Sequence, residues 1–254
     1  MLRSIRTCAA PSGRYRSVPP APALLGAVLL LAAGCGGLTS HGRNAEGVRL
    51  FQQARYHEAL REFQEANYTD PSNPDTYYNL AATFHRLGAV EDNSSYLDQA
   101  EQFYHMCLDH DEDHTDCYRG LAVLLAQQGR TDDAFRLLEG WASRRPDSPD
   151  ARIELARLFS EYGDRVAAKE HLLAALSIDP YNDRANKALG KIREDLGDYE
   201  QALANYQRSL ERNQFQPRVA SRVASLRSSL SASAPTAAQG DPTRLVDRPD
   251  ETLR

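Results

Sequence analysis

The densest group of residues that could do chemistry lies in one short polar stretch near the middle of the chain, residues 105–117. Imidazole nitrogen and thiolate sulfur are the ligands that zinc prefers in proteins. The stretch has neither a Cys-x-x-Cys pair nor a His-Glu-x-x-His helix motif, so its spacing specifies no metal site. Its three histidines, His105, His110 and His114, are therefore only weak candidates for zinc ligands. The alternative is that the stretch forms a solvated polar turn.

The two cysteines of the same stretch, Cys107 and Cys117, also suit a disulfide. They flank one expected interhelical turn, about one helical turn from it on each side. Their backbones could therefore come within the roughly 4.4 to 6.8 Å that a bridge requires. An oxidising compartment would favour pairing. A structural bridge and two free thiols remain the alternatives.

No other stretch carries a pattern typical of an active site. The chain has no glycine-rich phosphate loop and no Gly-x-Ser-x-Gly turn. Its acidic residues Glu154, Glu161 and Asp195 fall at helical positions where we expect solvation. We therefore predict no catalytic residues, no cofactor and no small-molecule substrate.

A repeat of thirty-four residues sets the elements that must position these side chains. The most regular copy, 149–182, places small residues where two helices must approach and ends its second helix at Pro180. Such a period is the signature of a solenoid. The repeats are expected over residues 40–216, as copies 40–73, 74–114, 115–148, 149–182 and 183–216.

Copy 74–114 departs from the period. Twelve positions separate Gly88 from Ala100 where five are expected, so seven residues have been added at the helix turn. Seven residues are close to two helical turns. Both helices could therefore lengthen while the same side chains stay on the packed face. The polar run from Glu91 to Ser95 favours instead a protruding loop followed by a capped helix start.

Two different segments follow the last copy. In residues 217–230, Val219, Val223, Leu226 and Leu230 recur at helical spacing, as expected of a helix that covers the open end of a solenoid. Residues 231–254 turn to Ser, Ala, Thr and Pro, with too little apolar surface to offset the entropy of ordering them. We expect a capping helix and then a disordered tail.

The repeat pattern resembles the tetratricopeptide repeat (TPR), most clearly in the tracts at residues 77–81 and 197–202. The resemblance implies an all-α fold in which antiparallel helix pairs stack into a right-handed superhelical solenoid. It also implies a concave groove, lined by the first helix of each repeat, that binds peptides or protein surfaces. By register the predicted groove residues are Tyr78, His85, Arg86, Arg119, Gln127, Arg157, Glu161, Lys187 and Lys191.

Four of these groove residues, Arg119, Arg157, Lys187 and Lys191, form a possible basic stripe. Such a stripe could attract an acidic segment or a C-terminal carboxylate through charge-assisted hydrogen bonds. Scattered surface charge is the alternative. The chain as a whole is acidic, with a net charge of −5, which does not favour nucleic-acid binding.

The N-terminus has the pattern of an export signal. Arginines precede an apolar run from Ala21 to Ala33, which is too short to span a bilayer. Residues 30–35 resemble the lipobox of bacterial lipoproteins, with Cys35 as the residue that would be acylated. We expect a signal peptide over 1–34 and a lipid-anchored linker over 35–39, the alternative being cleavage at small residues with Cys35 incidental. Gly36, directly after the cysteine, favours the periplasmic face of the outer membrane as the location of the protein.

These features together predict a lipid-anchored protein of the cell envelope that docks partner proteins and performs no chemistry. TPR lipoproteins with five or six repeats serve pilus-secretin assembly and outer-membrane protein insertion, and the architecture looks like theirs. Two alternatives stay open at this point. One is an accessory regulator of a cell-wall enzyme, and the other is a metal-dependent activity at the histidine-rich turn.

Overall fold

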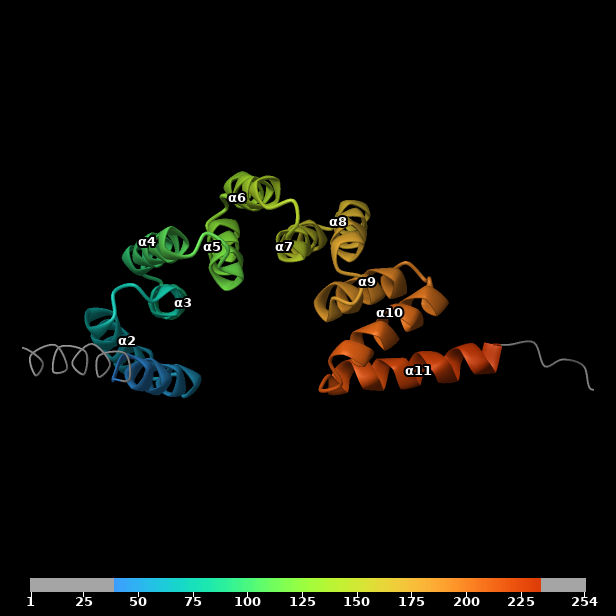
Figure 1. Cartoon of the computed structure of the whole chain (residues 1–254), viewed down its shortest axis with the longest axis horizontal. Helices are drawn as coiled ribbons and strands as arrows, with labels where there is room; N and C mark the ends of the chain where they lie inside the picture. The colour runs from blue at the N-terminus through green and yellow to red at the C-terminus, as the bar shows by residue number, and fades with distance from the viewer. Residues whose placement is uncertain (1–38, 234–254) are drawn as a thin grey trace, which may run out of the picture. The chain divides into compact units, whose positions relative to one another are not determined.

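The structure is a computed structural model that describes residues 39–233, and every regular element in that range is an α-helix (Figure 1). The expected all-α fold is confirmed. The expected signal segment 1–34, the acylation site Cys35 and the tail from residue 234 onward lie outside the described residues.

The chain divides into two units, and the boundary between them in the sequence falls between Asp111 and Glu112. The first unit contains a helical segment over residues 39–52 and three further helices. These helices are α2 (Tyr56–Thr69), α3 (Pro74–Glu91) and α4 (Ser94–His110).

The second unit contains three helical hairpins and a terminal helix. In each hairpin the two helices run side by side, α5 with α6, α7 with α8 and α9 with α10 (Figure 1). The bounds are α5 (Thr115–Gln127), α6 (Thr131–Arg144), α7 (Pro149–Glu161), α8 (Arg165–Ile178), α9 (Asp183–Asp195), α10 (Tyr199–Arg212) and α11 (Pro217–Ser233).

Small residues fill the helix contacts, as their spacing predicts. Ala168 and Ala175 on α8 are fully buried and pack with Ala156, Leu172 and Leu189 in one cluster. Burial of this apolar surface supplies most of the stabilisation of a helical hairpin, because isolated helices of this length are marginal in water. The fourth repeat is therefore held to the fifth by direct packing of α8 on α9.

The turn inside each hairpin holds one residue in the left-handed region. Gly129, Gly163 and Gly197 have φ values of 77°, 84° and 85°. Ala54 takes the equivalent place in the first copy with a φ of 60°, although a side chain disfavours that conformation. The glycine requirement thus reflects backbone geometry, since a Cβ at these three glycines would meet open space.

The seven added residues of copy 74–114 lengthen its helices, so the preferred expectation of a protruding loop was wrong. Helix α3 has 18 residues and α4 has 17, and only Asp92 and Asn93 separate them. Asp92 adopts the left-handed conformation, and the Asn93 side chain accepts a hydrogen bond from the Ser95 backbone N–H. A left-handed residue and an Asn cap complete the turn in two positions, so the added residues continue the helices.

Helix α11 closes the second unit. Val219, Val223 and Leu226 are buried against Ala202 and Tyr206 of α10. The helix runs to Ser233, three residues beyond the predicted capping helix and into the segment expected to be disordered. None of the described helices is both long and apolar enough to span a membrane.

Candidate partner-binding face

The first helices of the three hairpins in the second unit form one continuous row. Helix α5 contacts α7, and α7 contacts α9, whereas no contact as extensive joins α6 to α8 or α8 to α10 in the described residues. Helices that approach more closely lie on the inner side of a curved stack. The row of α5, α7 and α9 is therefore the inner face of this unit, where the family resemblance places a binding groove.

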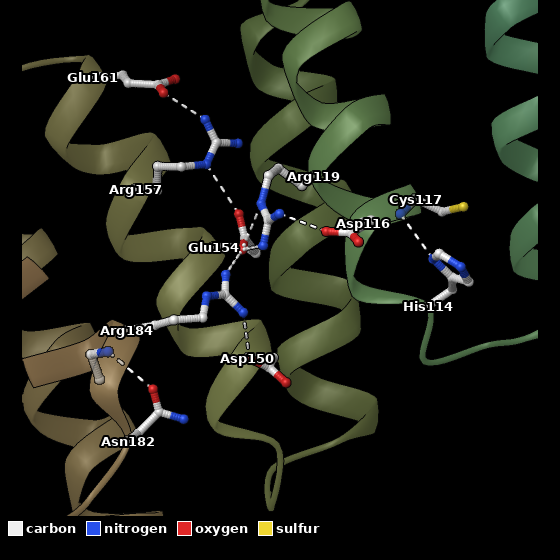
Figure 2. Close-up of polar contacts among 11 residues, drawn as sticks. His114, Asp116, Cys117, Arg119, Asp150, Glu154, Arg157, Glu161, Asn182 and Arg184 are labelled. Atoms are coloured by element: carbon white, nitrogen blue, oxygen red, sulfur yellow. Dashed lines mark hydrogen bonds and ion pairs between the residues drawn. The ribbon is translucent and has the colours of Figure 1, made fainter. Parts of the chain in front are cut away.

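Glu154 lies at the centre of this row and binds three arginines (Figure 2). Its side chain is fully buried. Arg119 of α5 donates to Glu154 Oε1 from Nε at 3.0 Å and from Nη2 at 2.6 Å. Arg157, one turn along α7, donates to Oε2 at 3.0 Å, and Arg184 of α9 donates to Oε1. One carboxylate thus joins three consecutive repeats.

Three further carboxylates accept hydrogen bonds from the same three arginines. Asp116 accepts from Arg119 at 2.6 Å, Glu161 accepts from Arg157 at 2.5 Å, and Asp150 accepts from Arg184 at 2.7 Å. We call these seven residues the Glu154 cluster. It contains three guanidinium groups and four carboxylates, so its positive charge is more than balanced inside the protein. The members are Asp116, Arg119, Asp150, Glu154, Arg157, Glu161 and Arg184.

The arginines also set the protonation state of Glu154. Burial raises the pKa of its carboxyl group, but hydrogen bonds and charge from Arg119, with further contributions from Arg157 and Arg184, outweigh that effect. The pKa of Glu154 therefore lies below its ordinary value of 4.5. The carboxylate is ionised at neutral pH, although no part of it is exposed to solvent.

Two sequence expectations on this face need correction. Glu154 was expected at a solvated position and is instead buried. Arg119 and Arg157 were expected in a basic stripe available to a partner, but carboxylates of the chain itself occupy both. The other two stripe residues, Lys187 and Lys191 on α9, are exposed, and neither forms an ion pair within residues 39–233.

Asp116, Asp150 and Arg184 are the members of the cluster that the sequence reasoning missed. A signal was present, because Asp150 and Arg184 occupy the same position of consecutive repeats, thirty-four residues apart. Arg119 and Glu154 are thirty-five residues apart. Opposite charges at the repeat period on first helices indicate ion pairs between neighbouring repeats.

The remaining predicted groove residues are split between the two units. In the first unit, Tyr78 and His85 lie on α3 with their rings 6.4 Å and 6.3 Å from that of Tyr104. Arg86 donates to the Tyr56 hydroxyl at 3.2 Å and lies over its ring. Gln127, at the end of α5 in the second unit, is exposed.

The three histidines considered as zinc ligands have separate surroundings. His105 is exposed on α4, 4.0 Å from Glu101, and His110 stacks on Tyr77 with 4.9 Å between ring centres. His114 Nδ1 accepts a hydrogen bond from the Cys117 backbone N–H and so caps α5 (Figure 2). Capping gives His114 a structural role.

The two cysteines are both buried, Cys107 on α4 in the first unit and Cys117 on α5 in the second. Cys107 takes a small packing position late in its helix, as the repeat register predicts. The disulfide between them stays a prediction.

Comparison with known families agrees with the repeat register. A family profile described as TPR repeat matches residues 47–88, and two described as tetratricopeptide repeat match residues 115–158 and 159–226. The chain belongs to the tetratricopeptide-repeat family. TPR hairpins present surfaces to other proteins, so this TPR chain is a protein–protein interaction scaffold.

Solved structures show the same fold. A thermophilic TPR protein of Thermus thermophilus, TTC0263, superimposes with a TM-score of 0.55 at 23% identity, covering 74% of this chain and 98% of that one. The structure titled as the functional characterization of Pseudomonas aeruginosa pilF has a TM-score of 0.50 at 16% identity, covering 80% and 95%. At these identities the likeness concerns the fold alone.

Curated relatives share only a repeat region with this TPR chain. The human protein O-mannosyl-transferase TMTC1 is 24% identical over 172 residues, which are 65% of this chain and 18% of that protein. Anaphase-promoting complex subunit 7 of Arabidopsis thaliana is 27% identical over 139 residues, or 54% and 25%. The match spans about a quarter or less of either relative.

Proposed function

We propose that this TPR protein is a lipid-anchored, non-catalytic scaffold that docks envelope proteins and assists the assembly or positioning of an envelope complex. The observation that supports docking most directly is the inner row of α5, α7 and α9 with its internally neutralised Glu154 cluster. A face whose charged side chains are already held in place loses little side-chain freedom when a partner binds.

Lys187 and Lys191 give this face its partner chemistry. They are one helical turn apart on α9, and two of the chain's three lysines are at these positions. Their ammonium groups can bind an acidic segment or a C-terminal carboxylate of a partner, without first leaving an internal ion pair. The predicted basic stripe is thus reduced to these two lysines.

The proposed anchor is the acylated Cys35. The residues that the structure describes begin at residue 39, four positions after that cysteine. Four extended residues reach about 14 Å at most, so an anchor at Cys35 would hold the repeats next to the membrane. Acyl chains contribute roughly 0.8 kcal/mol for each buried methylene, which is enough for stable attachment when more than one chain is present. We place the protein at the periplasmic face of the outer membrane.

The docking proposal is tested by reversing the charge of the two lysines together. The double variant Lys187→Glu/Lys191→Glu and the control Arg165→Glu, at an exposed position of α8, would be cross-linked in intact envelopes and isolated. We expect the double variant to lose at least nine-tenths of the partner recovered with the wild type, and the control to keep it. Equal recovery from both variants would contradict docking on the inner face.

The anchor is tested separately, because docking and anchoring can fail independently. We expect Cys35→Ser to move the protein from the membrane fraction to the soluble fraction and to abolish incorporation of a labelled fatty acid. The anchor would be ruled out if Cys35→Ser stayed in the membrane fraction and if Cys35 of the wild type carried no fatty acid. The docking proposal would still stand in that case.

A further inference from the structure

A second surface, on the other side of the second unit, combines apolar and cationic side chains. A groove of about 410 Å³ lies between α8 and α10, with α9 beneath it. Because α8 and α10 are second helices, this groove is separate from the inner row of first helices. We call it the outer groove; its principal lining residues are Leu173, Leu176, Tyr181, Leu189, Arg193 and Arg208.

The apolar wall of the outer groove remains accessible. Leu173 is 43% exposed, and Tyr181, in the turn after α8, is 65% exposed. Leu176 is half-buried beside them and continues the wall towards buried Leu189. These side chains leave apolar surface inside the groove, against which an apolar side chain of a partner can pack.

One of the two arginines of the groove, Arg193, is held by a chain of buried hydrogen bonds. Arg193 Nη1 donates to Asn205 Oδ1, and Asn205 Nδ2 donates to Asn186 Oδ1 at 2.9 Å. Asn186 Nδ2 in turn donates to the carbonyl oxygens of Pro180 and Asn182, both at 3.0 Å. Asn186 and Asn205 are almost completely buried, so this chain of hydrogen bonds fixes the position of the Arg193 guanidinium.

The two arginines of the outer groove differ from those of the Glu154 cluster. Within residues 39–233, no carboxylate pairs with Arg193 or with Arg208. The Nε of Arg193 is buried and also lacks a hydrogen-bond partner in that range. An anion can therefore bind these two guanidinium groups, beside the apolar wall, without first breaking an internal ion pair.

We propose that the outer groove docks a protein segment in which a carboxylate lies next to an aliphatic or aromatic side chain. The carboxylate would bind Arg208 and Nη2 of Arg193, and the apolar side chain would pack on Leu173, Leu176 and Tyr181. This proposal rests on the proposed function only in that the ligand is a protein. It assigns a different face and a different set of residues.

The test uses a display library of random twelve-residue peptides selected on the full chain. Selected peptides would be measured against three variants, Arg208→Glu, Leu173→Ser and the control Arg165→Glu. All three positions are exposed, so these substitutions should leave the fold intact. Circular dichroism would confirm the helix content of each variant.

We expect the selected peptides to carry Asp or Glu within two positions of an aliphatic or aromatic residue. Arg208→Glu should weaken their binding at least tenfold and Leu173→Ser at least threefold, with Arg165→Glu unchanged. A twin peptide with Gln or Asn in place of the acid should bind at least tenfold more weakly.

Three results would overturn the proposal. They are selection of no peptide, selection of peptides without an acid, and binding that is unaffected by Arg208→Glu. Competition by inorganic phosphate alone, at an affinity equal to that of the peptide, would show a simple anion site and would also overturn it. None of these results concerns Lys187 and Lys191, so the docking proposal for the inner face succeeds or fails independently.

Discussion

Substitution of Glu154 by Gln perturbs the Glu154 cluster with little change in shape. The variant removes the one buried negative charge that Arg119, Arg157 and Arg184 share. The amide keeps one oxygen acceptor and adds an N–H₂ group that faces donors. Three guanidinium groups then converge on a position without a compensating charge, and each must turn towards solvent or towards its remaining carboxylate.

The magnitude follows from burial. Removing one partner of a fully buried ion pair costs about 3 to 5 kcal/mol. Here the acid is fully buried, while the three arginine side chains are 35%, 27% and 34% exposed and can be partly rehydrated. We therefore expect a loss of about 2 to 3 kcal/mol in the free energy of unfolding, a large part of the roughly 5 to 15 kcal/mol typical of a domain.

Urea unfolding monitored by tryptophan fluorescence measures this loss. Trp141 is the only tryptophan, lies buried on α6 and stacks on Tyr118 of α5 with ring centres 4.2 Å apart. It therefore reports on the hairpin that Arg119 holds to the cluster. With a slope of about 2 kcal/mol/M, the midpoint should fall by about 1 to 1.5 M.

Glu161→Gln is the matched control, because Glu161 binds the same Arg157 but is 50% exposed. Exposed pairs contribute about 0 to 1 kcal/mol, so this variant should shift the midpoint by no more than about 0.5 M. Equal shifts for the two variants would refute the interpretation that the buried carboxylate joins the repeats.

Three further predictions concern acid, packing and the cysteines. Because the folded-state pKa of Glu154 is lowered, the stability it contributes is present above about pH 4.5 and is lost as the pH falls through the folded-state value. The stability difference between wild type and Glu154→Gln should accordingly shrink in urea titrations below pH 4.5, and a constant difference would count against the lowered pKa. Gly190→Ala should lower the free energy of unfolding by about 1 to 3 kcal/mol, since its Cβ would lie 2.8 Å from ring atoms of Tyr206; an unchanged urea midpoint would disprove that contact. Cys107 and Cys117 should resist alkylation until a reductant is added, as peptide mapping would show, and labelling of both without reductant would exclude the bridge.

The helices could be predicted from the sequence because small residues recur where helices touch. Ala168 and Ala175 are buried as that spacing requires. The connection at Asp92 and Asn93 was misjudged because a polar run has the composition of a loop, whereas one left-handed residue and one Asn cap complete the turn. Composition does not reveal how few residues a turn needs.

The site was harder to predict because the role of a charged residue depends on what faces it. Glu154 has the residue type and helix position of a solvated carboxylate, and only the approach of Arg119 and Arg184 from neighbouring repeats makes its burial favourable. Comparing charges across repeats, rather than within one helix, would have found these pairs. The exposure of Lys187 and Lys191 could be predicted, because no acid occupies the matching positions of the preceding repeat.

The most direct test of the scaffold is site-specific photo-cross-linking of the full chain in intact envelopes. A photoreactive amino acid would be placed at position 187 on the inner face or at position 166 on α8, where Val166 is 69% exposed. We predict a discrete cross-linked partner from position 187 and none from position 166. No cross-linked product from position 187, or the same product from both positions, would contradict a docking scaffold that uses its inner face.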